Sequence, residues 1–367
     1  MNVHELTTTN MLAPAARPLL DWYRANGRDL PWRRTTDPYP IWISEIMLQQ
    51  TRVAAVLGYY ARFLAAFPTV EDLAAAPEDV LLKLWEGLGY YSRARNLQKA
   101  ARIIAAAGHF PDTYEDLLAL PGVGEYTAGA IASAAFGLRE AAVDGNVLRV
   151  VMRLANCPDN ITDPKVKAAV RAAVQQVMPT QASDTRIFNQ AMMELGATVC
   201  GPNAEPRCGE CPLGDICLAR ASGTALSLPV KKAKKARRAE EKTVYVLLRE
   251  GKVALRQRSG TGLLASLWEF PNVEGTLEEN RAAEAVETWG LTAKQWHKRL
   301  SAKHIFTHVE WHMTGYVLEA AGEAGDFLWV DAAGLKAHAV PSAFGKFYEE
   351  ALRMLEREDA HGLLEEE

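Results

Sequence analysis

The chain lacks any apolar run that approaches the roughly 20 residues needed to cross a bilayer, which excludes a membrane-spanning helix. Its first twenty residues also lack a basic start followed by an apolar core, so we expect no secretory leader. We therefore expect a cytoplasmic protein whose thiols stay reduced. The net charge of −4 argues weakly against nonspecific nucleic-acid binding, but Lys231–Arg238 (KKAKKARR) is strongly basic, so total charge decides nothing.

Cysteine is scarce, and its placement is informative. Four of the five cysteines, Cys200, Cys208, Cys211 and Cys217, have the spacing C-x7-C-x2-C-x5-C. Thiolates gathered over so short a stretch suit a soft metal centre. A zinc ribbon normally has two C-x-x-C pairs, and here only Cys208 and Cys211 form one. The spacing favours a cubane iron–sulfur cluster, while structural zinc and disulfides stay open as alternatives.

The length of 367 residues, with 49% apolar and 23% charged residues, indicates a soluble globular protein of two domains. Residues 1–221 read as an all-α domain, because helix-forming stretches follow one another from about residue 11 onward. Asp163-Pro164, for example, supplies an N-cap and a first-turn proline. Residues 222–240 contain a Ser/Gly/Pro stretch and the basic run, which predicts an interdomain linker.

The residue pattern then changes, and residues 241–357 are predicted to form a compact α+β domain. Thr243–Leu248 and Val253–Arg258 flank Glu250-Gly251, which predicts a hairpin with a tight turn. Further strands are expected at His304–His308, Met313–Leu318 and Phe327–Val330, and helices near Leu277–Trp289 and Ser342–Arg357. Residues 358–367 form an acidic tail that we expect to fray.

The segment Leu120–Thr127 (LPGVGEYT) lies between two helix-forming stretches. It resembles the helix-hairpin-helix of DNA-binding enzymes, in which Gly122, Val123 and Gly124 would form a sharp turn. Backbone N–H groups at the start of the next helix could then hold a DNA phosphate without reading sequence. An ordinary helix-helix turn is the alternative.

The segment Ile41–Val53 (IWISEIMLQQTRV) contains an acidic residue in apolar surroundings. Ser44 is a candidate helix N-cap, and Glu45 sits among Ile43, Ile46 and Met47. A carboxyl group there would be partly desolvated, which raises its pKa and lets it hold a proton near neutral pH. The alternative is a first-turn glutamate that merely complements the helix dipole.

Four blocks together resemble the MutY-type adenine DNA glycosylases of the endonuclease III, or helix-hairpin-helix, superfamily. They are the Ile41–Val53 segment, LGYYSRARNL (Leu88–Leu97), DGNV (Asp144–Val147) and NQAMMELG (Asn189–Gly196), in matching order. The resemblance covers essentially the whole chain. It implies an all-α glycosylase domain with a [4Fe-4S] cluster on the four cysteines, followed by a Nudix (MutT)-like α+β domain. The first cysteine loop is one residue longer than the family pattern.

The resemblance also implies roles for four residues. Glu45 would protonate adenine at N7, and ionised Asp144 would stabilise the cationic sugar or bond to it transiently, while Tyr126 and Asn146 assist by hydrogen bonding. Bifunctional relatives carry a lysine where Tyr126 stands. A phenol cannot form an imine, so we expect base removal without efficient strand cleavage.

Adenine must leave the duplex to be excised. By resemblance, Gln50 and Tyr90 enter the base stack, with Leu88 beside them. Six residues would line the adenine pocket or its approach: Arg28, Trp32, Arg33, Leu48, Thr51 and Glu194. From the residues alone, Trp32 and Leu48 could equally belong to the core, and the two arginines could be solvated.

In the second domain, Phe306, Thr307 and His308 align with a family loop, Phe-Ser-His, that distinguishes 8-oxoguanine from guanine. Threonine keeps the hydroxyl and adds a methyl group. A metal pair on His304 and His308, or a plain structural role, is the alternative. The Arg-Glu and Glu-Glu pattern of a Nudix pyrophosphatase is absent from Glu274–Leu291, so this domain reads as a binding module.

The resulting hypothesis is a monomeric, nucleoid-associated hydrolase that removes adenine mispaired with 8-oxoguanine or G in duplex DNA, with no membrane partner. Two other function classes stay open. One is an endonuclease III-like glycosylase/lyase, and the other is a noncatalytic lesion-binding protein.

Overall fold

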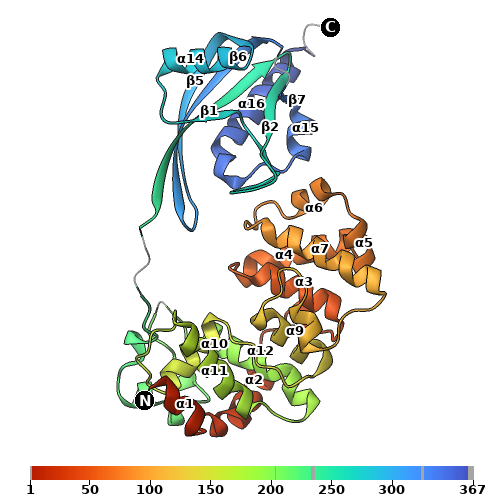
Figure 1. The fold of residues 1–367 in the computed structure, drawn as a ribbon. Helices are drawn as coiled ribbons and strands as arrows, with labels where there is room; N and C mark the ends of the chain where they lie inside the picture. Colours follow the sequence, from red (N-terminus) through yellow and green to blue (C-terminus); the bar gives the residue numbers. More distant parts are fainter. Residues whose placement is uncertain (1, 203, 233–235, 324–325, 363–367) are drawn as a thin grey trace. The chain divides into compact units, whose positions relative to one another are not determined.

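The computed structural model describes residues 2–202, 204–232, 236–323 and 326–362 (Figure 1). Residues 233–235 of the basic run and 363–367 of the acidic tail lie outside them. The chain forms two compact units. The first comprises Met1–Ala75 and Arg95–Ala233, and the second comprises Ala76–Ala94 and Lys234–Glu367. Over the described ranges, no helix is both long enough and apolar enough to span a bilayer.

Helices make up the first unit (Figure 1). They are α1 (Val3–Thr8), α2 (Ala16–Asn26), α3 (Pro38–Leu48), α4 (Val53–Ala66), α5 (Val70–Ala75), the greater part of α7 (Ser92–Ala107), α8 (Tyr114–Leu118), α9 (Glu125–Phe136), α10 (Gly145–Leu154), α11 (Pro164–Val177), α12 (Ala182–Thr198) and α13 (Leu218–Ala221). The short 3-10 helix η2 (Pro31–Arg33) lies between α2 and α3. The all-α prediction for this part of the chain is confirmed.

Local sequence signals start several of these helices. Asp163 caps α11 by accepting the backbone N–H of Lys165, as the Asp-Pro pair predicts. The prediction that Ser44 caps a helix is wrong. The N-cap of α3 is Asp37, one residue before a first-turn proline, and the Ser44 hydroxyl donates to the Ile41 carbonyl inside the helix at 2.7 Å. Glu45 therefore stands in the body of α3 and not in its first turn.

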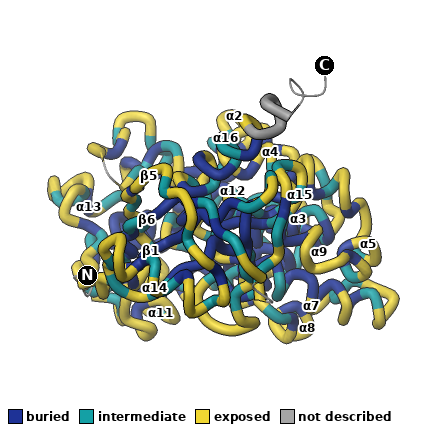
Figure 2. Tube along the Cα trace, turned by 90° about the horizontal axis from the view of Figure 1, so that it is seen from above, coloured by how far each residue is buried: buried dark blue, intermediate teal, exposed yellow. Residues whose placement is uncertain are grey.

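Helices α10 and α12 pack tightly in the core of the first unit. Every residue of Val147–Leu154 in α10 is buried, and so are most residues of α12 from Phe188 onward. Figure 2 draws buried stretches of the chain in dark blue. Gly196 of α12 makes the close approach possible, because a Cβ atom there would lie 2.6 Å from the Cβ atom of Asn146. The pairing brings the start of α10 beside the C-terminal end of α12.

A sheet of seven strands forms the centre of the second unit (Figure 1). The strands are β1 (Arg238–Arg249), β2 (Lys252–Gln257), β3 (Trp268–Glu269), β4 (Asn272–Glu274), β5 (Leu291–Ile305), β6 (Val309–Gly322) and β7 (Leu328–Val330). The main order is β3-β2-β1-β6-β5, with β1 parallel to β6 and the other pairs antiparallel. Glu250 (φ 50°) and Gly251 (φ 69°) form the predicted tight turn between β1 and β2.

Helices cover both faces of this sheet. Val244 and Val246 of β1 pack in a cluster with α16 (Gly345–Gly362), while Tyr245 and Leu247 pack in a second cluster with α14 (Glu279–Thr288). This alternation is the period of a strand buried on both sides. The unit also contains α6 (Glu78–Leu84) and α15 (Ala332–Ala337). The α+β prediction is confirmed.

The strand predicted at His304–His308 is wrong over its last three residues. Strand β5 ends at Ile305, and residues 306–308 form the turn into β6, closed by the Phe306 N–H on the Val309 carbonyl at 2.9 Å. The long antiparallel β5–β6 pair therefore carries residues 306–308 at its tip.

Candidate active site

A cavity of about 170 Å³ lies in the first unit, between η2, α3, α9, the start of α10, and α12. It brings together all the residues predicted for catalysis and for the adenine pocket, namely Arg28, Trp32, Arg33, Glu45, Leu48, Thr51, Tyr126, Asp144, Asn146 and Glu194. These positions span most of the first unit in sequence, so only the packing of the helices gathers them. Trp32 is also buried and packs edge-on against Tyr60, so it lines the cavity and belongs to the core.

Glu45 projects into the cavity from α3, whose neighbouring residues Ile43, Ile46 and Met47 are buried. Burial raises the pKa of the Glu45 carboxyl to about 7. The hydrogen bond from Tyr126 and the charge of Arg33 pull that pKa down, while the negative charge of Asp144 pushes it up. A carboxyl group in this environment can hold a proton near neutral pH and donate it to a bound base.

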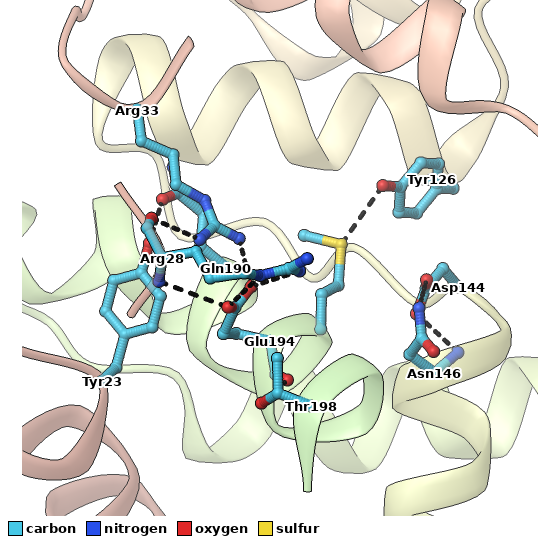
Figure 3. A network of polar contacts seen from close by, with 10 residues as sticks. Tyr23, Arg28, Arg33, Tyr126, Asp144, Asn146, Gln190, Glu194 and Thr198 are labelled. Carbon is cyan, nitrogen blue, oxygen red and sulfur yellow. Dashed lines mark hydrogen bonds and ion pairs between the residues drawn. The ribbon is translucent and has the colours of Figure 1, made fainter. Parts of the chain in front are cut away.

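The Tyr126 hydroxyl, at the start of α9, makes two contacts. It lies 2.7 Å from Glu45 Oε2 and 3.2 Å from Met193 Sδ. In Figure 3 the dashed line from Tyr126 ends on the yellow sulfur atom of that methionine. Burial raises the pKa of Tyr126 well above its usual value, so the phenol stays protonated and can donate to only one partner at a time.

Asp144 is the N-cap of α10. Its carboxylate accepts the backbone N–H groups of Asn146 (2.9 Å) and Val147 (2.8 Å). It also accepts the side-chain amide of Asn146 at 2.7 Å (Figure 3). Burial raises the pKa of Asp144 above its ordinary value, against these three hydrogen bonds, which lower it. The helix N-terminus was expected to keep this group charged. It favours the anion, but burial is the larger effect on the pKa.

Glu194 of α12 is enclosed by two arginines. Its side chain has 0% exposure, and it accepts Arg28 Nε at 2.5 Å, Arg28 Nη2 at 2.9 Å and Arg33 Nη2 at 2.8 Å. Burial alone would raise the pKa of Glu194, but the hydrogen bonds and charges of the two arginines hold it below its usual value. The alternative of two merely solvated arginines is therefore wrong, since both are held on one wall of the cavity (Figure 3).

Three residues that the sequence reading missed also line or support the cavity. Gln190 accepts the Tyr23 hydroxyl at 2.7 Å, and Met193 contacts Tyr126. Asn189 holds the loop before Asp144 through the Ala142 N–H and the Glu140 carbonyl. All three belong to the block NQAMMELG, and a helical period could have found them, because positions 190 and 194, and positions 189 and 193, share a face.

Arg149 of α10 links the cavity to the cysteine loop. Its Nη2 donates to Asn146 Oδ1 at 2.9 Å, and its Nε donates to the Cys200 carbonyl at 2.8 Å. Arg153, one turn later, donates to Cys200 Sγ at 3.2 Å and to the Gly201 carbonyl at 2.9 Å. Hydrogen bonds from Arg149 and Arg153 thus connect Asn146, which holds Asp144, to Cys200, the first cysteine of the motif.

The four cysteines of the motif line one small pocket with Arg153, and no disulfide joins any two of them. Within the described part of the chain, no three His, Cys, Asp or Glu side chains converge closely enough to share a single metal ion. Four thiols around one pocket are a donor set that an iron–sulfur cluster can use, because each cysteine of a cubane cluster binds a different iron atom.

The predicted DNA-contacting residues lie on exposed turns or beside them. Gln50, just after α3, and Tyr90 both adopt left-handed backbone angles, with φ of 59° and 48°. Such angles are uncommon for residues other than glycine and cluster at functional sites. Tyr90 is 45% exposed, whereas Leu88 is buried, so in this conformation Leu88 does not protrude.

The glycine turn before α9 has the expected conformation. Gly122 has φ of 79°, and a Cβ atom there would lie 2.8 Å from Asn96 Cβ. Both the backbone angle and the lack of space therefore require glycine. Gly124 is the N-cap of α9. Val123 is buried, and its backbone N–H donates to the Leu120 carbonyl at 3.1 Å.

In the second unit, Phe306 packs against His304 and Trp311, with ring centroids 4.5 and 4.8 Å apart. The Thr307 hydroxyl lies 2.9 Å from the Tyr90 hydroxyl, within the same unit. His308, the next residue of the turn, accepts the backbone N–H of Arg238 on its carbonyl at 3.1 Å. The turn at 306–308 therefore places a hydroxyl against an exposed aromatic residue.

Comparison with known protein families agrees with this architecture. Residues 43–176 match the HhH-GPD superfamily of base excision DNA repair proteins, and residues 243–350 match the NUDIX domain family. A solved thermostable thymine-DNA glycosylase superimposes on 59% of this chain and 99% of its own, with a TM-score of 0.52 and 29% identity. The fold and the cavity thus define a helix-hairpin-helix protein of base excision repair with an added Nudix-type domain.

Similar proteins of known family identify the branch of this superfamily more closely. The adenine DNA glycosylase of Homo sapiens is 36% identical over 83% of this chain and 67% of its own length. That of Buchnera aphidicola subsp. Baizongia pistaciae is 34% identical over 82% of this chain and 83% of its own. The chain belongs to the adenine DNA glycosylase family.

Proposed function

We propose that this protein is a monofunctional hydrolase that excises adenine mispaired with 8-oxoguanine or G in duplex DNA. The observation that carries the proposal is the pairing of Glu45, whose pKa is about 7, with Asp144 in one cavity. Adenine is a poor leaving group, and breaking its bond to C1′ leaves positive charge on the sugar. One carboxyl group must supply a proton and the other must remain an anion, as in glycosidases.

The steps follow from the contacts. Binding extrudes the adenine nucleotide, at a cost of a few kcal/mol, and seats the base against the wall formed by Glu194, Arg28 and Arg33. Protonated Glu45 donates its proton to N7, which makes the base a better leaving group. The Asp144 carboxylate, fixed by Asn146, stabilises the oxocarbenium-like sugar until water completes the hydrolysis.

Strand cleavage is not part of the proposed reaction. A lyase needs an amine that forms an imine with the sugar, and none of the described residues that line the cavity is a lysine. Tyr126 occupies the position of that amine in bifunctional relatives and instead hydrogen-bonds Glu45.

The residues proposed to contact DNA lie on or beside turns of both units. Gln50 and Tyr90 enter the stack that the adenine leaves, with Leu88 beside them, and the Gly122–Gly124 turn holds a phosphate at the N-terminus of α9. Phe306, Thr307 and His308 at the β5–β6 turn read the 8-oxoguanine. The enzyme acts as a nucleoid-associated monomer.

Cys200, Cys208, Cys211 and Cys217 would hold a [4Fe-4S] cluster. When bound, such a cluster supplies a rigid cross-link between the end of α12 and the loop that follows it, and no step of the hydrolysis requires electrons. Arg153 would then donate a hydrogen bond to one of its sulfur ligands.

The test incubates the protein with duplexes that contain A opposite 8-oxoguanine, A opposite G, or A opposite T, followed by alkali. Alkali-dependent breaks in the first two duplexes are expected. Breaks without alkali would indicate a lyase, and no breaks under either condition would indicate a noncatalytic binder. Glu45→Gln should bind the mispair and lower the single-turnover rate by about 10²–10⁴. A variant with normal turnover would remove Glu45 from the mechanism.

A further inference from the structure

The contact between Tyr126 and Met193 has no role in the reaction proposed above. Met193 projects from α12 into the cavity, and its Sδ lies 3.2 Å from the Tyr126 hydroxyl, on which Glu45 Oε2 also converges at 2.7 Å. A phenol has one hydrogen to donate, and these two acceptors compete for it. A carboxylate is much the stronger acceptor, whereas a thioether is a weak one.

The competition depends on whether Glu45 carries its proton. An ionised Glu45 attracts the phenol hydrogen by a charge-assisted hydrogen bond. A neutral Glu45 is a poorer acceptor, and the sulfur then provides an alternative place for that hydrogen at little cost. The groups that face Glu45 are Tyr126 from α9, Asp144 at the start of α10 and Arg33 from η2, the last paired with Glu194 of α12.

We propose that Met193 is a positioning residue for the reaction, since its sulfur accepts the Tyr126 hydrogen while Glu45 is neutral and releases it to Glu45 when the acid has given up its proton. No covalent change occurs at Tyr126. The O–H bond rotates from Sδ to Oε2 as the Glu45 proton moves to adenine N7. The hydrogen bond to Glu45 is then strongest when negative charge develops there, which stabilises the transition state more than the ground state.

The chemistry of the acceptor explains why a thioether suits this position. A residue with no acceptor would leave the phenol bonded to Glu45 at all times, so the bond would stabilise the carboxylate before the reaction. An amide oxygen would hold the hydrogen firmly and delay its transfer. A weak acceptor such as a thioether lies between these two cases, so the protonation state of Glu45 determines whether the Tyr126 hydrogen bonds the sulfur or the carboxylate.

The test uses two substitutions of similar volume, Met193→Leu and Met193→Gln. It rests on the proposed function, and its readout is the single-turnover rate of adenine excision opposite 8-oxoguanine between pH 5.5 and 9. The wild-type rate should fall as Glu45 loses its proton. Met193→Leu should move that fall to lower pH by about half to one unit, and Met193→Gln should move it to higher pH by a similar amount.

Tyr126→Phe provides the matched control. In a Tyr126→Phe background neither substitution should move the pH profile, because no phenol hydrogen is left to compete for. A shift that persists without the phenol, equal shifts in one direction, or no shift in folded variants would overturn the inference. If only one of the two Met193 variants folds, a shift of its pH profile opposite to the predicted direction would still overturn the inference. A wild-type protein that excises nothing would instead overturn the proposed function.

Discussion

The side-chain amide of Asn146 donates to Asp144 Oδ2 at 2.7 Å, and the carbonyl oxygen of the same amide is held by Arg149 at 2.9 Å. Asn146 is therefore fixed at both ends and cannot turn its amide away. A neutral residue with a fixed donor favours the Asp144 anion without adding a charge that would compete with the sugar cation.

Removal of that donor should make Asp144 harder to ionise. Burial already raises the pKa of Asp144, and the Asn146 amide is one of the contacts that lower it. Asn146→Ala should therefore move the acidic limb of the pH–rate profile to higher pH by roughly one unit or more, since a hydrogen bond to a charged group contributes about 1.5–3 kcal/mol. Single-turnover excision across pH measures this limb. An unchanged acidic limb would show that Asn146 does not control Asp144.

The raised pKa of Glu45 should also cost stability at high pH. Its pKa rises from 4.5 to about 7 on folding, so the folded protein holds this proton more tightly than the unfolded chain. Stability is then lost as pH rises from about 4.5 to 7, by on the order of 3 kcal/mol in all. Glu45→Gln does not titrate, so its Tm relative to wild type should increase between pH 5 and pH 8.5. Thermal unfolding at several pH values tests this, and a constant difference in Tm would argue against it.

Introduction of an amine at Tyr126 should create strand-cleaving activity. Tyr126 lines the cavity, and the family resemblance aligns it with the lysine of bifunctional relatives. Tyr126→Lys should form an imine with the sugar, which borohydride traps as a covalent protein–DNA adduct visible by gel electrophoresis. Tyr126→Met, of comparable length and without an amine, is the control. No adduct with the lysine variant would place residue 126 out of reach of C1′.

The Thr307 hydroxyl should contribute to the choice of mispair. It lies 2.9 Å from the Tyr90 hydroxyl at the tip of the β5–β6 pair. Thr307→Val keeps the shape and removes the hydrogen bond, so the preference for A opposite 8-oxoguanine over A opposite G should decrease several-fold. Thr307→Ser should retain that preference. The ratio of the two single-turnover rates measures it, and equal ratios for wild type and Thr307→Val would exclude a role for the hydroxyl.

Local sequence signals predicted the elements well where a single residue decides the structure. Asp163-Pro164 starts α11, Glu250-Gly251 turns the β1–β2 hairpin, and Gly122 takes the left-handed turn before α9. The N-cap prediction for Ser44 is wrong because a serine ahead of an apolar stretch resembles an N-cap. The helix in fact begins earlier, with Asp37 as its N-cap. The strand at His304–His308 was too long, because the tip of a hairpin has the same composition as its strand.

The site was harder to predict than the fold. The pattern around Glu45 suggested a desolvated acid, but it could not show that Tyr126, Asp144 and Glu194 line the same cavity, since these residues follow Glu45 by 81 to 149 positions along the chain. The family resemblance supplied that grouping. It did not supply Met193 or Arg149, whose roles depend on atoms within hydrogen-bonding distance and not on residue type.

Gly196 sets the spacing between α12 and the residue that holds the Asp144 carboxylate, although it carries no chemistry itself. The helix with Glu194 and Met193 rests directly against the residue that fixes Asp144, and a single added methyl group at position 196 would act as a wedge between them. Such a variant would keep every reactive atom and still lose activity through misalignment. Screens that examine only polar positions would overlook this kind of inactivating change.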